Sequence, residues 1–448
     1  MLDPAAAADT LASLIDAARR AGADAADAVY VGDRSTSVGV RKGALEDVSR
    51  AEGQEIGLRL FVGRGNAAVA SSDLAPESLS ALVDRALAMA REAPEDAFAG
   101  LAPDELLMGG PCADLDLDDG GDPDPAALRL LAEEAEDAAR AVPLVTNSNG
   151  GSASASAATF AIATSHGFVG TTRSTGYSCS ASVVAGTDEG MQRDYAWHSA
   201  RHWSDLESPA EIGRRAGERA AARLHPVRVP AGAMTILFDP RVATSLLGHF
   251  IAAINGAAIA RKSSFLLDAL GTQLFAPGIT VHDDPLRKRG PRSRGFDAEG
   301  LPVAACDLVE NGVLTGWIAD SAAARQLGIA PTGHAVRGVS GAPGAGPSNL
   351  FMQAGPRSRE EMIEGVANGI LVTELIGQGV NGVTGDYSRG AAGFLIVDGE
   401  VGPPVSEITI ASNLKDMFRT LEPASDLRLR RGIDSPTLLV PQMMVASA

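Results

Sequence analysis

The glycine-rich stretch from Leu371 to Leu414 constrains the fold of this chain more than any other segment. It reads LVTELIGQGVNGVTGDYSRGAAGFLIVDGEVGPPVSEITIASNL, in which LVTELI, FLIV and ITIA are short apolar and β-branched runs typical of strands. Asp398-Gly399 lies between FLIV and EVGPPV at the spacing of a two-residue hairpin turn. Six glycines separate the first two runs, and glycine permits a positive φ or a close backbone approach. The segment therefore predicts antiparallel strands with a glycine-rich loop between the first two.

The same loop carries the polar side chains that a binding cleft requires. They lie among the glycines and are Asn381, Asp386, Tyr387, Ser388 and Arg389. Loops that are held by a sheet often carry binding residues, so we expect these five side chains to contact a ligand. Arg389 would pair either with a carboxylate of a bound peptide or with Asp386.

Three of the glycines, Gly377, Gly379 and Gly382, also match the pattern G-x-G-x-x-G of dinucleotide-binding loops. In such sites a helix begins at the third glycine and points its N-terminus at the pyrophosphate. The following residues, VTGDYSRGAAG, contain three more glycines and no helical period. A bend between strands explains the pattern, and we expect no nucleotide cofactor.

Longer strings of this segment resemble the TldD/PmbA peptidase family. VNGVTGDYSRGAAGFLIVDGEV and PVSEITIASNLKDM are similar to its TldE (PmbA) branch, historically called a modulator of DNA gyrase. The likeness extends upstream through LLGHFIAAINGAAIARKSSFLLDALG, SRGFDAEG and ARQLG. The resemblance implies a subunit of a two-chain cytosolic peptidase, in which a TldD partner holds zinc on an H-E-x-x-x-H helix and the TldE chain holds none.

The resemblance also identifies the positions where a metal would bind. The family's metal helix corresponds to LLGHFIAAINGAAIARK, and its first histidine, glutamate and second histidine fall on Gly248, His249 and Ala253. A zinc peptidase needs such donors and one open coordination position for the water it activates. The zinc-bearing branch draws a further ligand from a cysteine near its C-terminus, and residues 421–448 contain none. We therefore expect no metal in this chain, zinc in the partner subunit, and a hydrogen-bonded core or interface role for His249.

One other pair of histidines has a spacing that suits zinc. His198 and His202 in WHSARHW are four residues apart and would share one face of a helix. Ser199 stands where a glutamate base would be needed, and the sequence offers no third ligand. An independent hydrolase that uses these histidines is one alternative, and a homodimeric peptide-binding or regulatory protein without catalysis is another. Spacing alone assigns no mutual geometry to Ser388, His334 and Asp386 as a hydrolytic triad.

Charge and composition exclude several classes of partner. The chain of 448 residues has a net charge of −18 and a pI near 4.8, so its surface repels nucleic acid and anionic membranes. The one basic cluster, residues 287–294, is interrupted by glycine and proline and reads as a solvated loop. The three cysteines are far apart, which indicates neither disulfides nor a thiolate metal site. With no basic leader and no run of ~20 apolar residues, we predict a cytoplasmic protein.

The pattern along the chain predicts an α+β protein with a boundary at HPVRVPAG. Residues 1–226 form an α/β domain with antiparallel strands, among them 27–32, 36–43 and 55–63. Its flanking helices cover residues 4–21, 76–93, 126–142 and 208–224, the last with a capping box of Ser208 and Glu211. Residues 227–448 form a mostly antiparallel, barrel-like β domain around one helix from Pro240 to about Lys262. The predicted function is that of the metal-free subunit of a two-component zinc metallopeptidase, which binds unstructured peptides by strand addition to a sheet edge.

Overall fold

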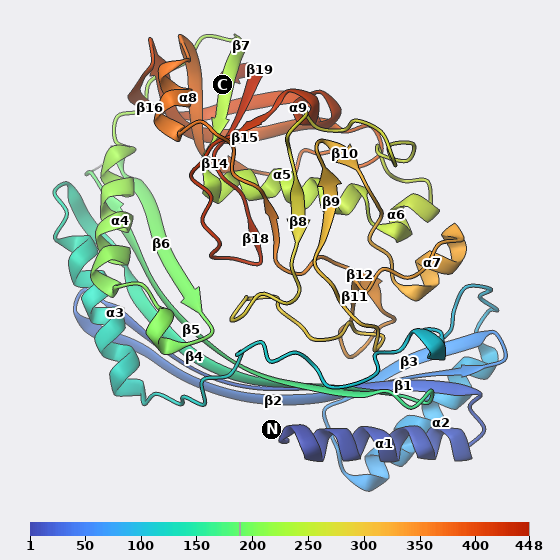
Figure 1. Ribbon diagram of the computed structural model, residues 1–448. Coiled ribbons are helices and arrows are strands. Elements are labelled where there is room, and N and C mark those ends of the chain that lie inside the picture. The colour runs from blue at the N-terminus through green and yellow to red at the C-terminus, as the bar shows by residue number, and fades with distance from the viewer. Residues whose placement is uncertain (188–189, 448) are drawn as a thin grey trace.

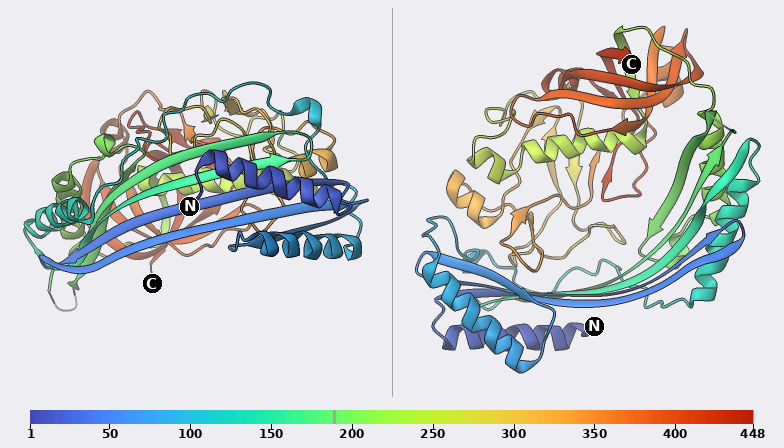
Figure 2. Two further views of the ribbon diagram at one scale, coloured as in Figure 1. Left: turned by 90° about the horizontal axis from the view of Figure 1, so that it is seen from below. Right: turned by 180° about the vertical axis from the view of Figure 1, so that it is seen from behind.

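The computed structural model describes residues 1–187 and 190–447, and its N-terminal part is a strongly curved antiparallel sheet (Figure 1). The sheet has six strands in the order β3-β2-β1-β4-β5-β6. Their bounds are β1 (Ala25–Arg41), β2 (Ala44–Val62), β3 (Gly65–Ser71), β4 (Val145–Thr164), β5 (Val169–Ala185) and β6 (Gln192–Ala200). The C-terminal part of the chain lies against the concave face of this sheet (Figure 2).

Helices cover the convex face of the sheet in two pairs (Figure 1). They are α1 (Pro4–Arg20) and α2 (Pro76–Glu92) at one end, and α3 (Pro125–Arg140) and α4 (Pro209–Ala222) at the other. The apolar period predicted for α1 is confirmed, because its buried residues are Ala7, Leu11, Leu14, Ile15 and Ala18. The backbones of helices α3 and α4 are in close contact, because a Cβ added to Gly213 would lie 2.0 Å from the carbonyl oxygen of Ala135. Small residues therefore set how closely these helices pack.

Three local predictions for this part of the chain are wrong. Residues 27–32 and 36–43 were expected to form separate strands, whereas β1 runs through both without interruption. Strand β2 begins at Ala44, whereas the sequence pattern predicts a start near residue 55. The pattern misses the first ten residues because they are exposed on both faces and therefore show no apolar alternation. At the start of α4 the Ser208 side chain makes no capping hydrogen bond, so the predicted capping box does not form.

The C-terminal part contains the predicted barrel. Its five strands are β7 (Gly232–Phe238), β14 (Asn368–Ile376), β15 (Asp386–Val397), β16 (Glu400–Asn413) and β19 (Leu438–Ser447). They pair in the order β16-β15-β14-β7-β19, and a further pairing of β16 with β19 closes the barrel. Only the β7–β14 pair is parallel. The turn predicted at Asp398-Gly399 joins β15 to β16, with φ of 49° and 84°.

The helix predicted from Pro240 to about Lys262 is two helices. Helix α5 (Pro240–Ala253) ends at Ile254, and α6 (Gly256–Ala260) follows after Asn255, whose side chain accepts a hydrogen bond from the Ala257 N–H at 3.1 Å. An asparagine cap explains the break, because it satisfies a free N–H at the start of a new helix. Phe250 of α5 packs edge to face on Phe275 and Phe418 in the largest core of the molecule.

A second, smaller sheet and short elements complete this part of the chain. The sheet has the order β10-β9-β8-β13-β18, and Asn311-Gly312 forms the hairpin turn predicted between β9 and β10. Its strands are β8 (Val281–Asp283), β9 (Cys306–Glu310), β10 (Val313–Leu314), β13 (Leu350–Met352) and β18 (Ile433–Asp434). The remaining elements are η1 (Asp104–Leu106), η3 (Trp203–Asp205), α7 (Ser321–Leu327), β11 (Ala335–Val336), β12 (Gly344–Ala345), α8 (Arg359–Glu364), α9 (Leu414–Thr420) and β17 (Glu422–Pro423). Within residues 1–187 and 190–447, no helix has both the length and the apolar character of a membrane span.

A buried ion cluster joins the curved sheet to the C-terminal part. Asp27 of β1, which is 3% exposed, accepts hydrogen bonds from Arg59 of β2, one of them from Nε to Oδ2 at 3.0 Å, and from Arg337. Nearby, the backbones touch: a Cβ on Gly57 of β2 would lie 1.9 Å from the carbonyl oxygen of Val339. The loop around Arg337 and Val339 is therefore fixed against the concave face of the sheet.

Candidate functional site

Helix α5 lies inside the C-terminal part and carries Gly248, His249 and Ala253, the three positions at which the sequence predicts that a metal motif has been lost. Gly248 has no side chain, Ala253 is buried and offers only a methyl group, and His249 is half-buried. One imidazole does not form a zinc site, which needs three or four donors. No group of three histidine, cysteine, aspartate or glutamate side chains in the described part of the chain is arranged to hold a metal ion. The residues present on α5 therefore do not fit a zinc centre.

His249 instead faces polar side chains of β15. The rings of His249 and Tyr387 are 6.1 Å apart between centroids and meet edge to face at 77°. Arg389 lies two residues further along the same face of β15, with 9% of its surface exposed. Among the described residues, the buried His249 Nε2, Tyr387 hydroxyl and Arg389 Nε atoms all lack a hydrogen-bond partner. Unpaired buried polar atoms are rare because each costs about 1–3 kcal/mol, and they often mark a functional position.

Burial decides the ionisation of this cluster. Burial raises the pKa of Tyr387 to about 12, so the phenol stays protonated at neutral pH. Burial also lowers the pKa of His249, and the charge of Arg389 lowers it further, which favours the neutral imidazole. The cluster thus combines one guanidinium with two neutral groups that can each donate a hydrogen bond. Such a set can bind a carbonyl or carboxylate oxygen.

The five residues predicted to line a cleft fall on opposite sides of β15. Tyr387 and Arg389 point inward to His249, whereas Asp386 and Ser388 are exposed because side chains alternate along a strand. Asn381 is exposed in the preceding loop, and its N–H donates to the Asp386 carbonyl at 2.9 Å. The Asp386 side chain accepts from Thr384 and Asn413, at 2.6 and 3.1 Å, and within the described residues makes no ion pair with Arg389.

The geometry expected for His198 and His202 is wrong, because the segment is a strand end and not a helix. His198 lies in β6 opposite Cys179, and β6 ends two residues before His202. His198 Nδ1 accepts a hydrogen bond from the Glu207 N–H at 3.2 Å. His202 Nε2 lies 3.0 Å from the Asp116 carbonyl oxygen. Each imidazole is engaged by a different partner, so the structure brings no pair of free histidine donors together here.

A third histidine, His334, belongs to a buried group with Asp283 of β8 and Cys306 of β9 in the smaller sheet, whereas Ser388 and Asp386 lie on barrel strand β15. Its Nε2 lies 3.4 Å from Asp283 Oδ2 and 4.0 Å from Cys306 Sγ. Burial alone would lower the pKa of His334, but Asp283 and Cys306 raise it to about 9. The ion pair with Asp283 therefore favours the protonated imidazole of His334 at neutral pH.

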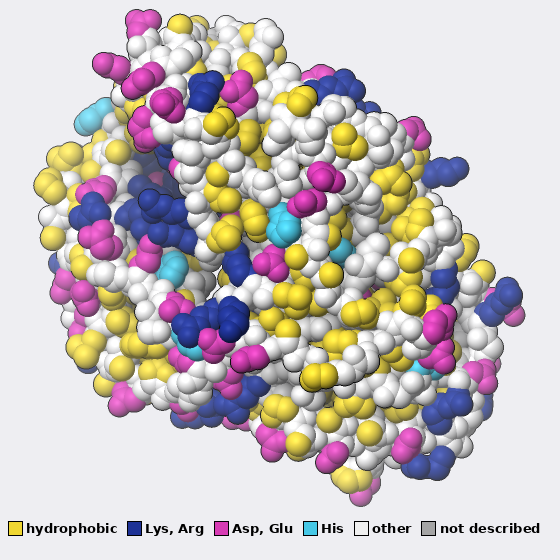
Figure 3. Space-filling view, viewed as in Figure 1, with side chains coloured by type: hydrophobic (Ala, Val, Ile, Leu, Met, Phe, Trp, Pro, Cys, Tyr) yellow, Lys and Arg dark blue, Asp and Glu magenta, His cyan; other side chains and the backbone are white. Residues whose placement is uncertain are grey.

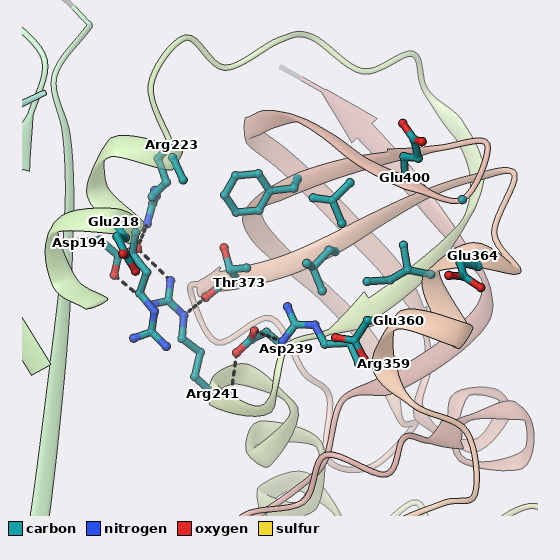
Figure 4. Close-up of a pocket in the computed structure, with 17 residues that line it drawn as sticks. Asp194, Glu218, Arg223, Asp239, Arg241, Arg359, Glu360, Glu364, Thr373 and Glu400 are labelled. Atoms are coloured by element: carbon teal, nitrogen blue, oxygen red, sulfur yellow. Dashed lines mark hydrogen bonds and ion pairs between the residues drawn. The ribbon is translucent and has the colours of Figure 1, made fainter. Parts of the chain in front are cut away.

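A hollow lies between the end of the curved sheet and the barrel (Figure 4). It consists of two cavities of about 920 Å³ and 530 Å³ that share lining residues, among them Arg219, Arg241 and Arg359. The Arg241 guanidinium donates to both oxygens of Asp194 at 2.8 and 3.0 Å and to the Thr373 carbonyl at 2.6 Å. Arg241 of α5 thus connects Asp194 of β6 to barrel strand β14, in which Thr373 lies.

Strand β6 borders this hollow as the edge of the curved sheet. It pairs with β5 and has no second strand neighbour among the described residues, and its Tyr195 and Trp197 line the smaller cavity. Both aromatic rings are exposed, at 53% and 39%. Sequence reasoning missed the hollow because its lining combines segments that are far apart in the chain, namely β6, α4, α5, α8, the barrel strands and residues 426–435.

Comparison with known proteins gives matches along nearly the whole chain. Residues 26–90, 118–224 and 231–447 match, in turn, domain 1, the central domain and the C-terminal domain of the PmbA/TldA metallopeptidases. Metalloprotease PmbA of Escherichia coli O157:H7 is 37% identical over 425 residues, which cover 94% of this chain and 92% of that protein. A Metalloprotease PmbA homolog of Haemophilus influenzae is 34% identical over 96% of this chain and 94% of its own.

Solved structures show the same architecture. A Bacteroides thetaiotaomicron protein named as a candidate modulator of DNA gyrase has a TM-score of 0.91 at 27% identity and covers 98% of each chain. TldE from Thermococcus kodakarensis has a TM-score of 0.87 at 20% identity, over 98% of this chain and all of the other. At that identity the second likeness is one of fold.

Proposed function

Because the chain belongs to the PmbA/TldD metallopeptidase family, we propose that it is the metal-free subunit of a two-component cytosolic peptidase and that a TldD-like, zinc-bearing chain is its partner. The observation that carries this proposal is the state of α5. At the three motif positions it has Gly248, His249 and Ala253, which together supply one nitrogen donor. With a single donor on that helix, this chain would need a second chain that holds the metal in order to cut peptides.

The proposed contribution of this chain is to hold the substrate. An extended peptide would add to the free edge of β6, where backbone hydrogen bonds bind segments of varied sequence. The exposed Tyr195 and Trp197 rings on that strand would cover the apolar parts of the peptide. Unstructured chains suit this mode because their backbone groups are free to pair.

The inward cluster on β15 is the second part of the proposed site. His249, Tyr387 and Arg389 would bind a carbonyl or carboxylate oxygen of the peptide, which would supply the partner that their buried polar atoms lack. Asn381, Asp386 and Ser388 lie on the outer side and would contact a different stretch of substrate or the partner subunit. These assignments extend the prediction made from the glycine-rich loop.

The experiment is reconstitution. This chain and the TldD-like chain of the same genome are purified separately, mixed, and tested for complex formation by size-exclusion chromatography and for cleavage of an unstructured peptide. We expect a stable heterocomplex, peptidase activity in the mixture and none in this chain alone. Failure of the two chains to associate would refute the proposal.

Two variants test the substrate-holding role within the complex. Replacing Tyr387 by Phe keeps the ring and removes the buried hydroxyl, so we expect a higher KM for peptide with the complex intact. Ser80→Ala, on the exposed side of α2 on the convex face of the sheet, also removes a single hydroxyl; it is the control and should leave KM unchanged. If homodimers of this chain bind peptide, and no cleavage occurs with or without the TldD-like chain, the alternative of a homodimeric peptide-binding protein without catalysis would be favoured instead.

A further inference from the structure

The smaller cavity of the hollow concentrates positive charge on an acidic protein. Its lining includes seven arginines against four acidic residues, although the whole chain carries a net charge of −18. The arginines are Arg215, Arg219, Arg241, Arg359, Arg428, Arg430 and Arg431. In the space-filling view, basic side chains gather in the hollow between the end of the sheet and the C-terminal part (Figure 3). A concave site lined by one sign of charge focuses its field and attracts ligands of opposite charge.

Some of these arginines already have carboxylate partners. Arg241 is paired with Asp194, Arg359 with Asp239 at 3.0 Å, and both Arg215 and Arg430 with Glu207. These ion pairs join the elements around the hollow and leave little charge for a ligand.

Three arginines are different. Within residues 1–187 and 190–447, Arg219, Arg428 and Arg431 have no carboxylate oxygen within 4.0 Å. Two acids of the lining are held by other donors: Asp434 accepts from the backbone N–H groups of Arg430 and Arg431, and Asp426 accepts from Thr437 at 2.8 and 2.7 Å. Because no carboxylate of the described residues forms an ion pair with these three guanidinium groups, they are available to a carboxylate of a ligand.

Two of the three unpaired arginines, Arg219 and Arg431, are also held in place beside the free strand edge. Arg219 of α4 donates to the Tyr195 carbonyl of β6 at 3.3 Å, and burial lowers the pKa of its guanidinium, an effect that the charge of Arg241 reinforces. Arg431 stacks over the Trp197 ring at 5.1 Å from its centroid. Stacking on an aromatic face orients a guanidinium while leaving its N–H groups free to donate.

From this arrangement we propose that the hollow binds carboxylate groups of a peptide, with Arg219, Arg428 and Arg431 as the contacts. The proposal deepens the proposed function, because it takes the ligand to be a peptide, and it adds a preference for acidic substrates. Guanidinium groups bind carboxylates through paired N–H donors, and aromatic rings next to them cover the flanking backbone. The carboxylate comes either from Asp and Glu side chains or from the C-terminus of the peptide.

The test measures binding of short, fluorescently labelled peptides to the full chain alone by fluorescence anisotropy. The parent peptide is unstructured, rich in glutamate and has a free C-terminus; in one version each Glu is Gln, in another the C-terminus is amidated, and a third has both changes. Loss of affinity with Gln identifies side-chain carboxylates, and loss on amidation identifies the terminal carboxylate. Equal affinity for the parent and the doubly changed peptide would overturn the proposal, as would tighter binding of single-stranded nucleic acid than of any of these peptides.

Variants locate the site. Arg428→Gln and Arg431→Gln should each weaken binding of the parent peptide about tenfold, the loss expected for one charge-assisted hydrogen bond. Arg20→Gln, at the exposed end of α1 on the far face of the sheet, is the matched control and should bind like the wild type. Wild-type affinity in the Arg428→Gln/Arg431→Gln double variant would refute the assignment.

This outcome is separable from that of the proposed function. Binding is measured on the single chain, whereas the proposed function is judged by association and cleavage with the zinc-bearing partner. Loss of arginine-dependent binding with cleavage intact in the complex removes only the carboxylate site. Binding with no partner association removes only the two-component peptidase.

Discussion

Asp27 provides a sharp test of how the two parts of the molecule are held together. Its carboxylate is the only anion hydrogen-bonded to Arg59 and Arg337 among the described residues, and the side chains of these arginines are 5% and 0% exposed. Replacing Asp27 by Asn keeps the shape and one acceptor oxygen but removes the carboxylate charge to which both buried guanidinium groups are hydrogen-bonded. Removing one partner of a buried ion pair costs about 3–5 kcal/mol, and we expect the free energy of unfolding to fall by that amount.

The assay is equilibrium unfolding in urea, followed by circular dichroism. Asp33→Asn is the matched control, because Asp33 is exposed on the same face of β1, and it should change the free energy by less than about 0.5 kcal/mol. The double variant Asp27→Asn/Arg337→Met removes the Arg337 charge together with its Asp27 partner. Its loss in the free energy of unfolding should therefore be smaller than the sum of the losses in the two single variants. Additive costs, or an Asp27→Asn variant as stable as the control, would refute the reasoning.

The pH dependence has a defined sign. Burial alone would raise the pKa of Asp27, but Arg59 and Arg337 hold it below its ordinary value. Its contribution to stability is therefore present above the pKa of an unfolded aspartate and is lost as the pH falls through the lowered folded value. The difference between the wild type and Asp27→Asn should shrink in acid and stay constant from neutral to mildly alkaline pH.

Three further predictions concern other buried groups. The pKa of His334 is raised to about 9, so its protonated form stabilises the fold fully below pH 6.5, and the free energy of unfolding falls by about 3 kcal/mol as the pH rises through 9. His334→Gln should abolish this fall, which urea titrations at pH 7 and pH 10 would measure. Burial raises the pKa of Glu299 to about 7, so the free energy of unfolding falls as the pH rises from 4.5 to 7. Glu299→Gln keeps the oxygen that accepts from Ser321. This variant should be up to about 3 kcal/mol more stable than the wild type at pH 8 and equally stable near pH 4.5. Gly57→Ala places a Cβ against the Val339 carbonyl oxygen and should lower the free energy of unfolding by about 1–3 kcal/mol. Gly39→Ala should lower it less, because the nearest atom to its Cβ would be Asp47 Cβ at 3.9 Å. Equal losses in the two variants would contradict the close contact at Gly57.

The sequence was most informative where local chemistry alone decides the structure. Turns at Asp398-Gly399 and Asn311-Gly312 follow from the positive φ that these residues adopt readily, and both form as predicted. The face of α1 follows from its apolar period. Within the glycine-rich loop, Gly377 and Gly385 have positive φ and Gly379 approaches the Ser388 carbonyl, whereas Gly382 shows neither requirement.

Prediction failed where distant segments decide the outcome. The first half of β2 has no apolar alternation, and the neighbouring β1 holds it in the sheet by backbone pairing. His198 and His202 look like a helical pair, but pairing of β6 with β5 makes the segment extended. The hollow and the ion cluster of Asp27, Arg59 and Arg337 are assembled from segments hundreds of residues apart, and no local pattern in the sequence reveals which charged side chains meet.

The most direct test of the central claim is a measurement of zinc and peptidase activity on the same samples. This chain alone, its TldD-like partner alone and the reconstituted complex are analysed for bound zinc by mass spectrometry and for cleavage of an unstructured peptide. The account predicts no stoichiometric zinc and no cleavage with this chain alone, and one zinc per heterodimer with cleavage in the complex. Stoichiometric zinc and peptide turnover by this chain alone, abolished by replacing His198, His202 or His249, would contradict it.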